Sequence, residues 1–302
     1  MSPGWFFLGA MIVAYGVANL LQSIAAANTE VHHGISPRLL LRLGQQRVYL
    51  VGLACQFFGF LLAVLARRDL PLFLVQASVA AGLGVTALLG VVVLRWKLPK
   101  TEIVLLGAMC FGVAALVVAA RPAPSHPLDL AAMIGLGAVL LIVMVGGFFA
   151  VRMHGSPGSV VLGSLAGLAF GAAAVASRPL ASVHSVQQFV TNPLLYLLIA
   201  HSVVGQLLLG MAMQRGSTTA AVAAMDASAA APAAAVGLLL LGDEIWPGRE
   251  WLAAAGFLVT LVSVIGLSFY AVPQHHHPIS GRHRPPVVPP RRQTRALNPQ
   301  DS

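Results

Sequence analysis

Side chains able to bind an ion or transfer a proton are few in this 302-residue chain, and the strongest candidates lie inside apolar stretches. Asp226 is the only carboxylate well inside such a stretch. Ala229, Ala230 and Ala233 follow it at helical spacings of three, four and seven. Small side chains on one helix face let another helix or a ligand approach closely. We predict that Asp226 either binds a cation or proton in a cavity, or bonds a neighbouring group near the end of its helix.

His201 lies near the centre of the preceding apolar stretch. An imidazole there can bind substrate or couple proton movement together with Asp226, because burial and a nearby carboxylate both move its pKa. Alternatively, it stays neutral and makes a hydrogen bond across a helix interface. Gln206 follows about one and a half turns later on a different stripe, which favours a bond to another helix. It is kept as a further cavity candidate.

The first apolar stretch carries a polar stripe. Tyr15, Asn19, Gln22 and Ser23 are spaced by four, three and one residues, which places all four on one helix face. Such a face does not meet lipid without a cost in free energy. The stripe therefore either lines a water-filled cavity or makes hydrogen bonds between helices, and Asn19 and Gln22 are candidates for the cavity.

Gln76 occupies a position similar to that of Asp226, because each is followed by Ala and Ser. Aligning the charged hairpins that follow the two stretches leaves Gln76 and Asp226 about one turn apart, so they are expected to share a face. Ser228 joins them as a cavity candidate. Pro232 removes a backbone hydrogen bond from its helix and acts either as a hinge or as a static kink.

The composition defines the elements that must position these residues. Hydrophobic residues make up 58% of the chain and charged residues 9%, with a mean hydropathy of +0.84. A soluble domain carries roughly 25% charge, so a soluble enzyme, a nucleic-acid-binding domain and a disulfide scaffold are excluded. The net charge of +9 comes largely from basic residues at the ends of apolar runs and in the C-terminal tail, which indicates membrane anchors and no nucleic-acid partner.

The expected fold is an all-α integral membrane protein with about nine transmembrane helices, the range being nine to ten. Each apolar run is about 18–25 residues long, enough to cross a bilayer, and the runs are continuous, which argues against a barrel. The predicted spans are 4–27, 47–66, 70–94, 102–120, 129–151, 159–176, 192–214, 218–241 and 250–271.

Lysine and arginine in the loops predict the orientation. With the C-terminus in the cytoplasm, 13 basic residues lie inside and five outside, namely Arg67, Arg68, Arg121, Arg178 and Arg249. The positive-inside rule therefore favours a multi-pass protein of the plasma membrane with its N-terminus outside.

An internal repeat divides the membrane part into residues 1–121, with about four helices, and 122–272, with about five. In both halves a long small-residue stretch ends in an aliphatic run and is followed by a short charged hairpin. A shorter helix then begins with an acid and reaches a glycine within about two turns, from Glu102 to Gly107 and from Glu250 to Gly256. The predicted topology makes the two copies inverted, an arrangement common in transporters.

This doubled motif resembles the drug/metabolite transporter superfamily, the EamA-like membrane proteins. The resemblance covers roughly residues 4–271 and is clearest at Leu238–Gly256. It implies two inverted repeats and transport activity, with the family's second span missing from the first half. A nine-span layout is similar to the magnesium-transporter (NIPA-like) branch. Lys97 replaces the family's acidic residue in the first hairpin, so this hairpin is not expected to play the same electrostatic role.

Residues 273–302 are expected to form a disordered, basic, Pro/His/Arg-rich cytoplasmic tail. Its histidines, His275 to His277 and His283, either stay solvated or bind a metal, and its arginines can contact anionic lipid. No GxxxxGK[ST] loop and no Cys/His ligand spacing occurs elsewhere, and the loops are short. We expect no enzymatic activity, no cofactor and no structural metal site.

The expected function is a secondary carrier that moves a small metabolite or cation by alternating access, with proton coupling through Asp226 and His201. Three alternatives stay open at this stage. The first is a magnesium or other divalent-cation transporter. The second is a membrane scaffold or assembly subunit whose tail recruits partners. The third is a translocase for lipids or lipid-linked sugars.

Overall fold

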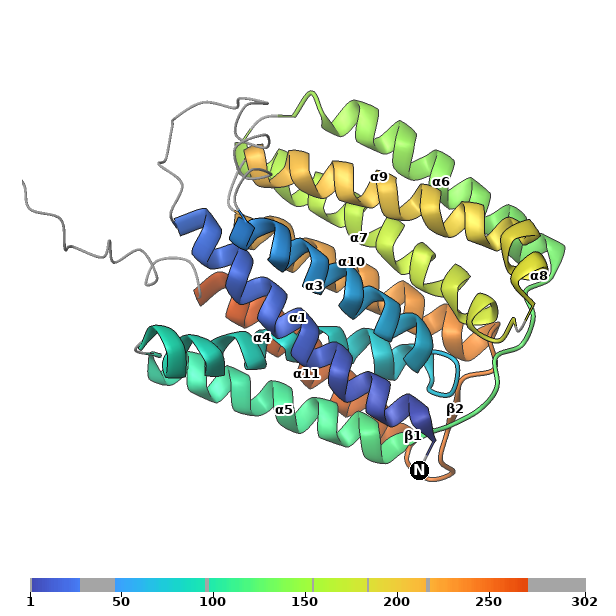
Figure 1. Ribbon diagram of the computed structural model, residues 1–302, viewed down its shortest axis with the longest axis horizontal. Coiled ribbons are helices and arrows are strands. Elements are labelled where there is room, and N and C mark those ends of the chain that lie inside the picture. Colours follow the sequence, from blue (N-terminus) through green and yellow to red (C-terminus); the bar gives the residue numbers. More distant parts are fainter. Residues whose placement is uncertain are drawn as a thin grey trace, which may run out of the picture.

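The computed structural model describes residues 2–27, 47–95, 98–153, 155–183, 185–215 and 218–270. They form long helices that run alongside one another (Figure 1), and every predicted apolar run is helical. The long helices are α1 (Pro3–Ala27), α3 (Arg47–Ala66), α4 (Leu72–Leu94), α5 (Lys100–Ala119), α6 (Leu130–Ala150), α7 (Gly155–Ala181), α9 (Pro193–Arg215), α10 (Thr218–Leu239) and α11 (Glu250–Tyr270).

Eight of the described helices are long and apolar enough to cross a membrane, one fewer than the nine predicted. The exception is α10, which is helical over 22 residues but has a shorter described apolar part, Ala224–Leu239. Helix α7 extends beyond the predicted span 159–176 at both ends and contains Arg178 and Pro179. The chain is therefore a mostly helical, multi-pass membrane protein.

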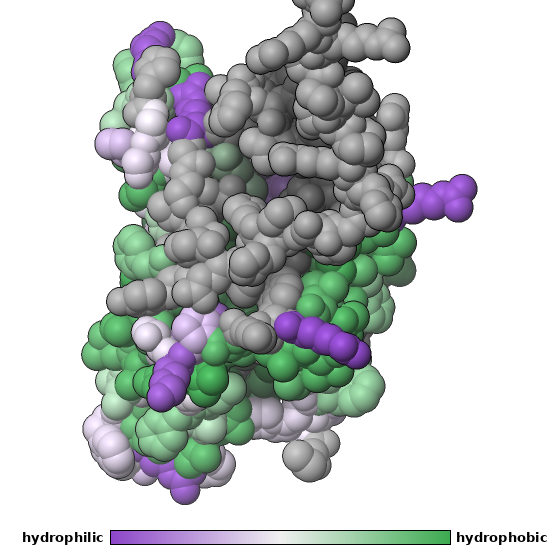
Figure 2. Space-filling model, turned by 90° about the vertical axis from the view of Figure 1, so that its left-hand side faces the viewer, coloured by the Kyte–Doolittle hydropathy of each residue, from purple (hydrophilic) through white to green (hydrophobic). Residues whose placement is uncertain are grey.

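The flanks of the bundle are covered by large apolar side chains. On α6, Ile134, Leu141, Ile142 and Phe148 are all more than half exposed. Viewed from the end opposite the N-terminus, hydrophilic side chains project among hydrophobic surfaces (Figure 2). Large exposed apolar side chains of this kind are unfavourable in water, whereas lipid tails cover them without cost.

The long helices pack in two sets. Helix α1 packs against α3 and α4, and α7 packs against α9 and α10 in the same order. Helix α5 lies against α11, and α4 lies against α10, so the two sets meet along these four helices. Helix α6 has no counterpart in the first set and covers α7 and α9.

The end of the bundle that carries the N-terminus also carries two short strands, and we call it the β end (Figure 1). Strand β1 (Ala120–Arg121) pairs antiparallel with β2 (Glu244–Ile245). Arg121 and Glu244 form an exposed ion pair across the two strands at 3.0 Å. The short helix α8 (Val186–Thr191), which the sequence did not predict, also lies at this end.

Gly112 sets the distance between α5 and α11. A Cβ atom at this position would lie 2.4 Å from Thr260 Oγ1 and 2.8 Å from the carbonyl oxygen of Gly256. Because one of these neighbours is backbone, a larger residue would force the two helices apart. Small residues allow this kind of close helix packing in membranes, where van der Waals contact contributes much of the association.

Gly112→Ala should therefore destabilise the protein, with a loss of about 1–3 kcal/mol in the free energy of unfolding. The matched control is Gly107→Ala on the same helix, where an added Cβ meets nothing within 4 Å. It should leave stability unchanged or slightly raised. Thermal unfolding of both variants in detergent tests this, and equal melting temperatures would contradict the assigned crossing.

Candidate functional site

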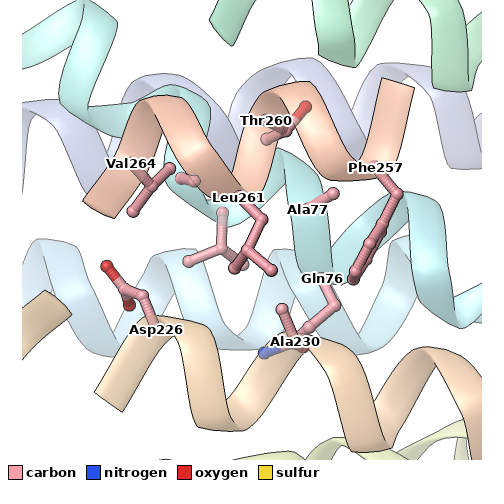
Figure 3. A pocket seen from close by; sticks show the side chains of 10 residues that line it. Gln76, Ala77, Asp226, Ala230, Phe257, Thr260, Leu261 and Val264 are labelled. Atoms are coloured by element: carbon pink, nitrogen blue, oxygen red, sulfur yellow. The ribbon is translucent and has the colours of Figure 1, made fainter. Parts of the chain in front are cut away.

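A small pocket lies within the bundle between α4, α10 and α11, where the two sets of helices meet (Figure 3). Its cavity volume is about 30 Å³, which is room for roughly two waters. The walls are mostly apolar. Its lining consists of Gln76, Ala77, Val79, Ala80, Asp226, Ala230, Phe257, Thr260, Leu261 and Val264.

Two predicted site residues, Gln76 and Asp226, are brought together in this pocket. Gln76 lies on the second turn of α4, and Asp226 lies on α10. In Figure 3 their side chains occupy opposite ends of the cavity. Asp226 is half-buried, and within the described part of the chain it forms no hydrogen bond or ion pair. Among the described residues, the pocket lining therefore contains one carboxylate without a partner.

The larger hollows on the molecule differ in character. One of about 870 Å³ lies along α1 and α3, and one of about 540 Å³ lies between α6 and α9. Their linings are almost entirely apolar, with Phe6, Val13 and Phe58 in the first and Leu130 and Ile134 in the second. These hollows face outward, where acyl chains can fill them, so neither resembles a binding site for a polar solute.

Four of the predicted cavity residues that the structure describes do not line this pocket, namely His201, Ser228, Gln206 and Asn19. His201 is fully buried on α9, with Nδ1 2.8 Å from the carbonyl oxygen of Leu197. Ser228 Oγ donates to the carbonyl oxygens of Ser164, at 2.9 Å, and Ala224, at 2.6 Å. Gln206 is exposed on the flank of the bundle. These side chains lie outside this pocket, and a role for them in solute binding stays a prediction.

The physical reason lies in how α10 and α9 are turned. Helix α10 approaches α7 so closely that a Cβ at Gly167 would lie 2.1 Å from Ser228 Oγ. This contact turns Ser228 toward α7 while Asp226, two residues earlier, faces α4 and α11. Pro232 of the same helix is exposed. His201 and Gln206, five residues apart on α9, end up on different faces of that helix.

The polar stripe of α1 is only partly visible. Tyr15 packs between α3 and α4, since a Cβ at Gly59 would lie 3.3 Å from its ring and one at Gly82 would lie 3.1 Å from its Cβ. Asn19 is half-buried but does not line the pocket. The side chains of Gln22 and Ser23, like Lys97 and the tail histidines, lie outside the described residues. Tyr15 therefore serves helix packing.

Two buried arginines at the β end are the main feature that sequence reasoning missed. The count of loop charges assigns Arg67 and Arg178 to outside loops, but in the structure they are 4% and 0% exposed. Arg178 lies inside α7, one residue before Pro179, and Arg67 lies in the five-residue connection between α3 and α4. Their sequence positions gave no signal of this burial, since Arg68 of the same connection is exposed.

The charge of Arg178 is compensated by Asp243, which lies in the hairpin that follows α10. It forms a buried ion pair with Asp243, and its second amino group donates to the carbonyl oxygen of Ala123 at 3.3 Å. The other carboxylate oxygen of Asp243 accepts a hydrogen bond from the backbone N–H of Phe73 at 3.3 Å. Asp243 thus links α7 to the start of α4 at the β end.

Arg67 makes a second link between the two sets of helices. Its guanidinium donates to Ser177 Oγ of α7 at 3.0 Å and to Gln76 Oε1 of α4 at 3.3 Å. Ser177 Oγ in turn donates to the carbonyl oxygen of Ala174 at 2.7 Å. Burial lowers the pKa of Arg67 to about 10, so the guanidinium stays protonated at neutral pH.

The described residues contain no group of three or more His, Cys, Asp or Glu side chains placed to hold a metal ion. Comparisons with protein families, with curated proteins and with solved structures found no match. The arguments below therefore depend on the geometry of the chain itself.

The buried ion pair predicts a contrast between two neighbouring acids. Asp243→Asn should lower the free energy of unfolding by about 3–5 kcal/mol, because Arg178 would keep a buried charge without a counter-charge. Glu244→Gln removes the exposed partner of Arg121 and should cost less than about 1 kcal/mol. Thermal unfolding of both variants measures the difference. Equal losses would show that Asp243 does not compensate Arg178.

Proposed function

We propose that this protein is a secondary transporter that moves a small solute across the membrane by alternating access. The observation that carries the proposal is Asp226, a carboxylate without a partner among the described residues, facing a small pocket between apolar helices. Ionisable residues at membrane depth cost about 2.5–3.5 kcal/mol on insertion scales, so they are retained mainly where they bind a solute or ion.

The packing order of the helices supports an inverted repeat. In our assignment α1, α3, α4 and α5 correspond to α7, α9, α10 and α11, and α6 is the additional helix. The connection from α4 to α5 and the connection from α10 to α11 lie at opposite ends of the bundle (Figure 1), as inversion requires. Transporters with inverted repeats bind their solutes at the repeat interface, and the pocket lies between α4 and α10.

We assign α10 as a ninth crossing, since its 22 residues span about 33 Å at 1.5 Å per residue. With nine crossings the two termini lie on opposite sides of the membrane, and we assign the β end with the N-terminus to the outside and the C-terminus to the cytoplasm of a plasma membrane. Burial of Arg67 and Arg178 strengthens this orientation, because only Arg68, Arg121 and Arg249 then remain as outside basic residues in the loops.

Transport by this pocket requires it to change size. A cavity of about 30 Å³ does not hold a metabolite, so α4 has to separate from α10 and α11 for a solute to enter. Helix α10 is the candidate for this movement. Pro232 has no N–H to donate to the carbonyl of Ser228, which weakens the helix one turn after Asp226 and lets it bend there.

The chemistry of the pocket favours an organic solute over a bare divalent cation. Mg²⁺ is commonly held by carboxylates together with its own waters, and the pocket lining contains one carboxylate among mostly apolar side chains. A solute with a protonated amine and an apolar body matches this lining better. Proton coupling through Asp226 is part of the proposal, whereas His201 lies outside the pocket.

Asp226→Asn should abolish transport without loss of expression, because it removes the charge and keeps the shape of the side chain. A ligand is first identified by thermal stabilisation of the full-length protein against a panel of metabolites and ions, Mg²⁺ included. Uptake is then measured in proteoliposomes.

Two glutamine variants serve as a matched pair in the same assay. Gln76→Leu should reduce uptake at least tenfold, whereas Gln206→Leu, on the exposed flank, should retain it. Full activity of Asp226→Asn would contradict the assigned site, and growth rescue by Mg²⁺ in a transport-deficient host would favour the divalent-cation alternative.

A further inference from the structure

The two buried arginines at the β end differ in one respect that bears on the pocket. Arg178 has Asp243 as its counter-charge. Within the described residues the guanidinium of Arg67 donates hydrogen bonds only to neutral oxygens, those of Ser177 and Gln76, and its Nε is buried without a hydrogen-bond partner. The described chain therefore leaves one positive charge next to the pocket without a counter-charge. A buried charge in this state is costly in free energy, which favours a ligand that supplies the counter-charge.

Gln76 connects this charge to the pocket, because it accepts a hydrogen bond from Arg67 and also lines the pocket wall. A guanidinium can only donate hydrogen bonds, so the amide oxygen of Gln76 must face Arg67 and the NH₂ group must face away from it. In Figure 3 the side-chain nitrogen of Gln76 lies beside Ala230, on the pocket wall. A hydrogen bond from a charged donor polarises the amide, which makes its NH₂ group a stronger donor.

Asp226 presents the opposite charge at the other end of the same cavity, and it has no partner within the described ranges. Between the two ends, the walls are formed by Ala77, Ala230, Leu261 and Phe257. A purely cationic solute would compensate Asp226 and leave Arg67 unpaired, and a purely anionic solute would do the reverse. Only a solute with both charges completes both ends.

We propose that the transported solute is a small zwitterion, whose anionic group faces Gln76 and Arg67 and whose protonated amine faces Asp226. Its uncharged part is apolar or aromatic and contacts the walls between the two ends. This inference rests on the proposed transport function, and it adds Arg67 as the residue that selects for the anionic group.

The test uses triplets of compounds that share one carbon skeleton. They are glycine, methylamine and acetate; leucine, 3-methylbutylamine and 4-methylvalerate; and phenylalanine, phenethylamine and 3-phenylpropionate. Thermal stabilisation of the full-length protein in lipid nanodiscs is measured for each at neutral pH. In at least one triplet the zwitterion should half-saturate at a concentration ten or more times lower than its amine or its acid.

Arg67→Gln should raise the half-saturating concentration of that zwitterion at least tenfold and change that of the matched amine less than twofold. The control is Arg68→Gln, the same substitution one residue further along on an exposed side chain. It should change neither value. Asp226→Asn should weaken binding of both the zwitterion and the amine.

Gln76→Glu keeps the test decisive, because loss of a buried arginine can unfold the protein. A glutamate at this position supplies the missing counter-charge for Arg67. The variant should melt at or above the temperature of the unaltered protein, and its preference should change from zwitterion to amine.

Three outcomes would overturn the inference. They are a zwitterion preference that survives in Gln76→Glu, an amine that binds as well as its zwitterion to the unaltered protein, and no stabilisation by any member of the triplets. If amines are transported, and this transport is lost in Asp226→Asn but unchanged in Arg67→Gln, the zwitterion inference is wrong and the proposed function stands. If transport is unchanged in Asp226→Asn, the proposed function of this site is wrong.

Discussion

A bilayer offers no water to polar groups inside the bundle, so each such group needs a partner within the protein or in its ligand. This chain has 18 basic and nine acidic residues, yet Arg67, Arg178 and Asp243 are all buried at the β end. Their contacts reach α4, α7, the segment after β1 and the hairpin after α10. The arrangement of the helices at this end depends on satisfying these three side chains.

Small residues determine how closely the helices approach and which side chains meet. Gly112 lets α5 cross α11 at backbone contact, and Gly167 does the same for α7 and α10. These crossings bring α10 and α11 together with α4 around one small pocket. Under the proposed function, opening the pocket from the β end requires the contacts of Arg67 with Ser177 and Gln76 to break. A solute that competes for Gln76 would weaken the same contacts.

Much of the fold could be predicted from the sequence, because long runs of apolar residues can satisfy their backbone only as helices in lipid. All nine predicted runs are helical, and only the apolar part of α10 is shorter than expected. The pairing of Gln76 with Asp226 also followed from sequence, since the two residues hold similar positions before the hairpins of a repeated motif. The distance along the chain from each of these residues to its hairpin does not depend on how the helices pack.

The faces that the helices present to one another were decided only by the tertiary structure. Hydropathy is nearly uniform around these helices, so the sequence did not indicate that Ser228 faces α7, that Gln206 lies on the flank or that His201 lies outside the pocket. The same holds for Arg67 and Arg178, whose positions at span ends resemble those of solvated anchors. Sequence determined which segments form long apolar helices and that Asp226 lies within one of them. Packing through small residues determined how each helix is turned, and with it which polar groups share the pocket and which charge lacks a partner.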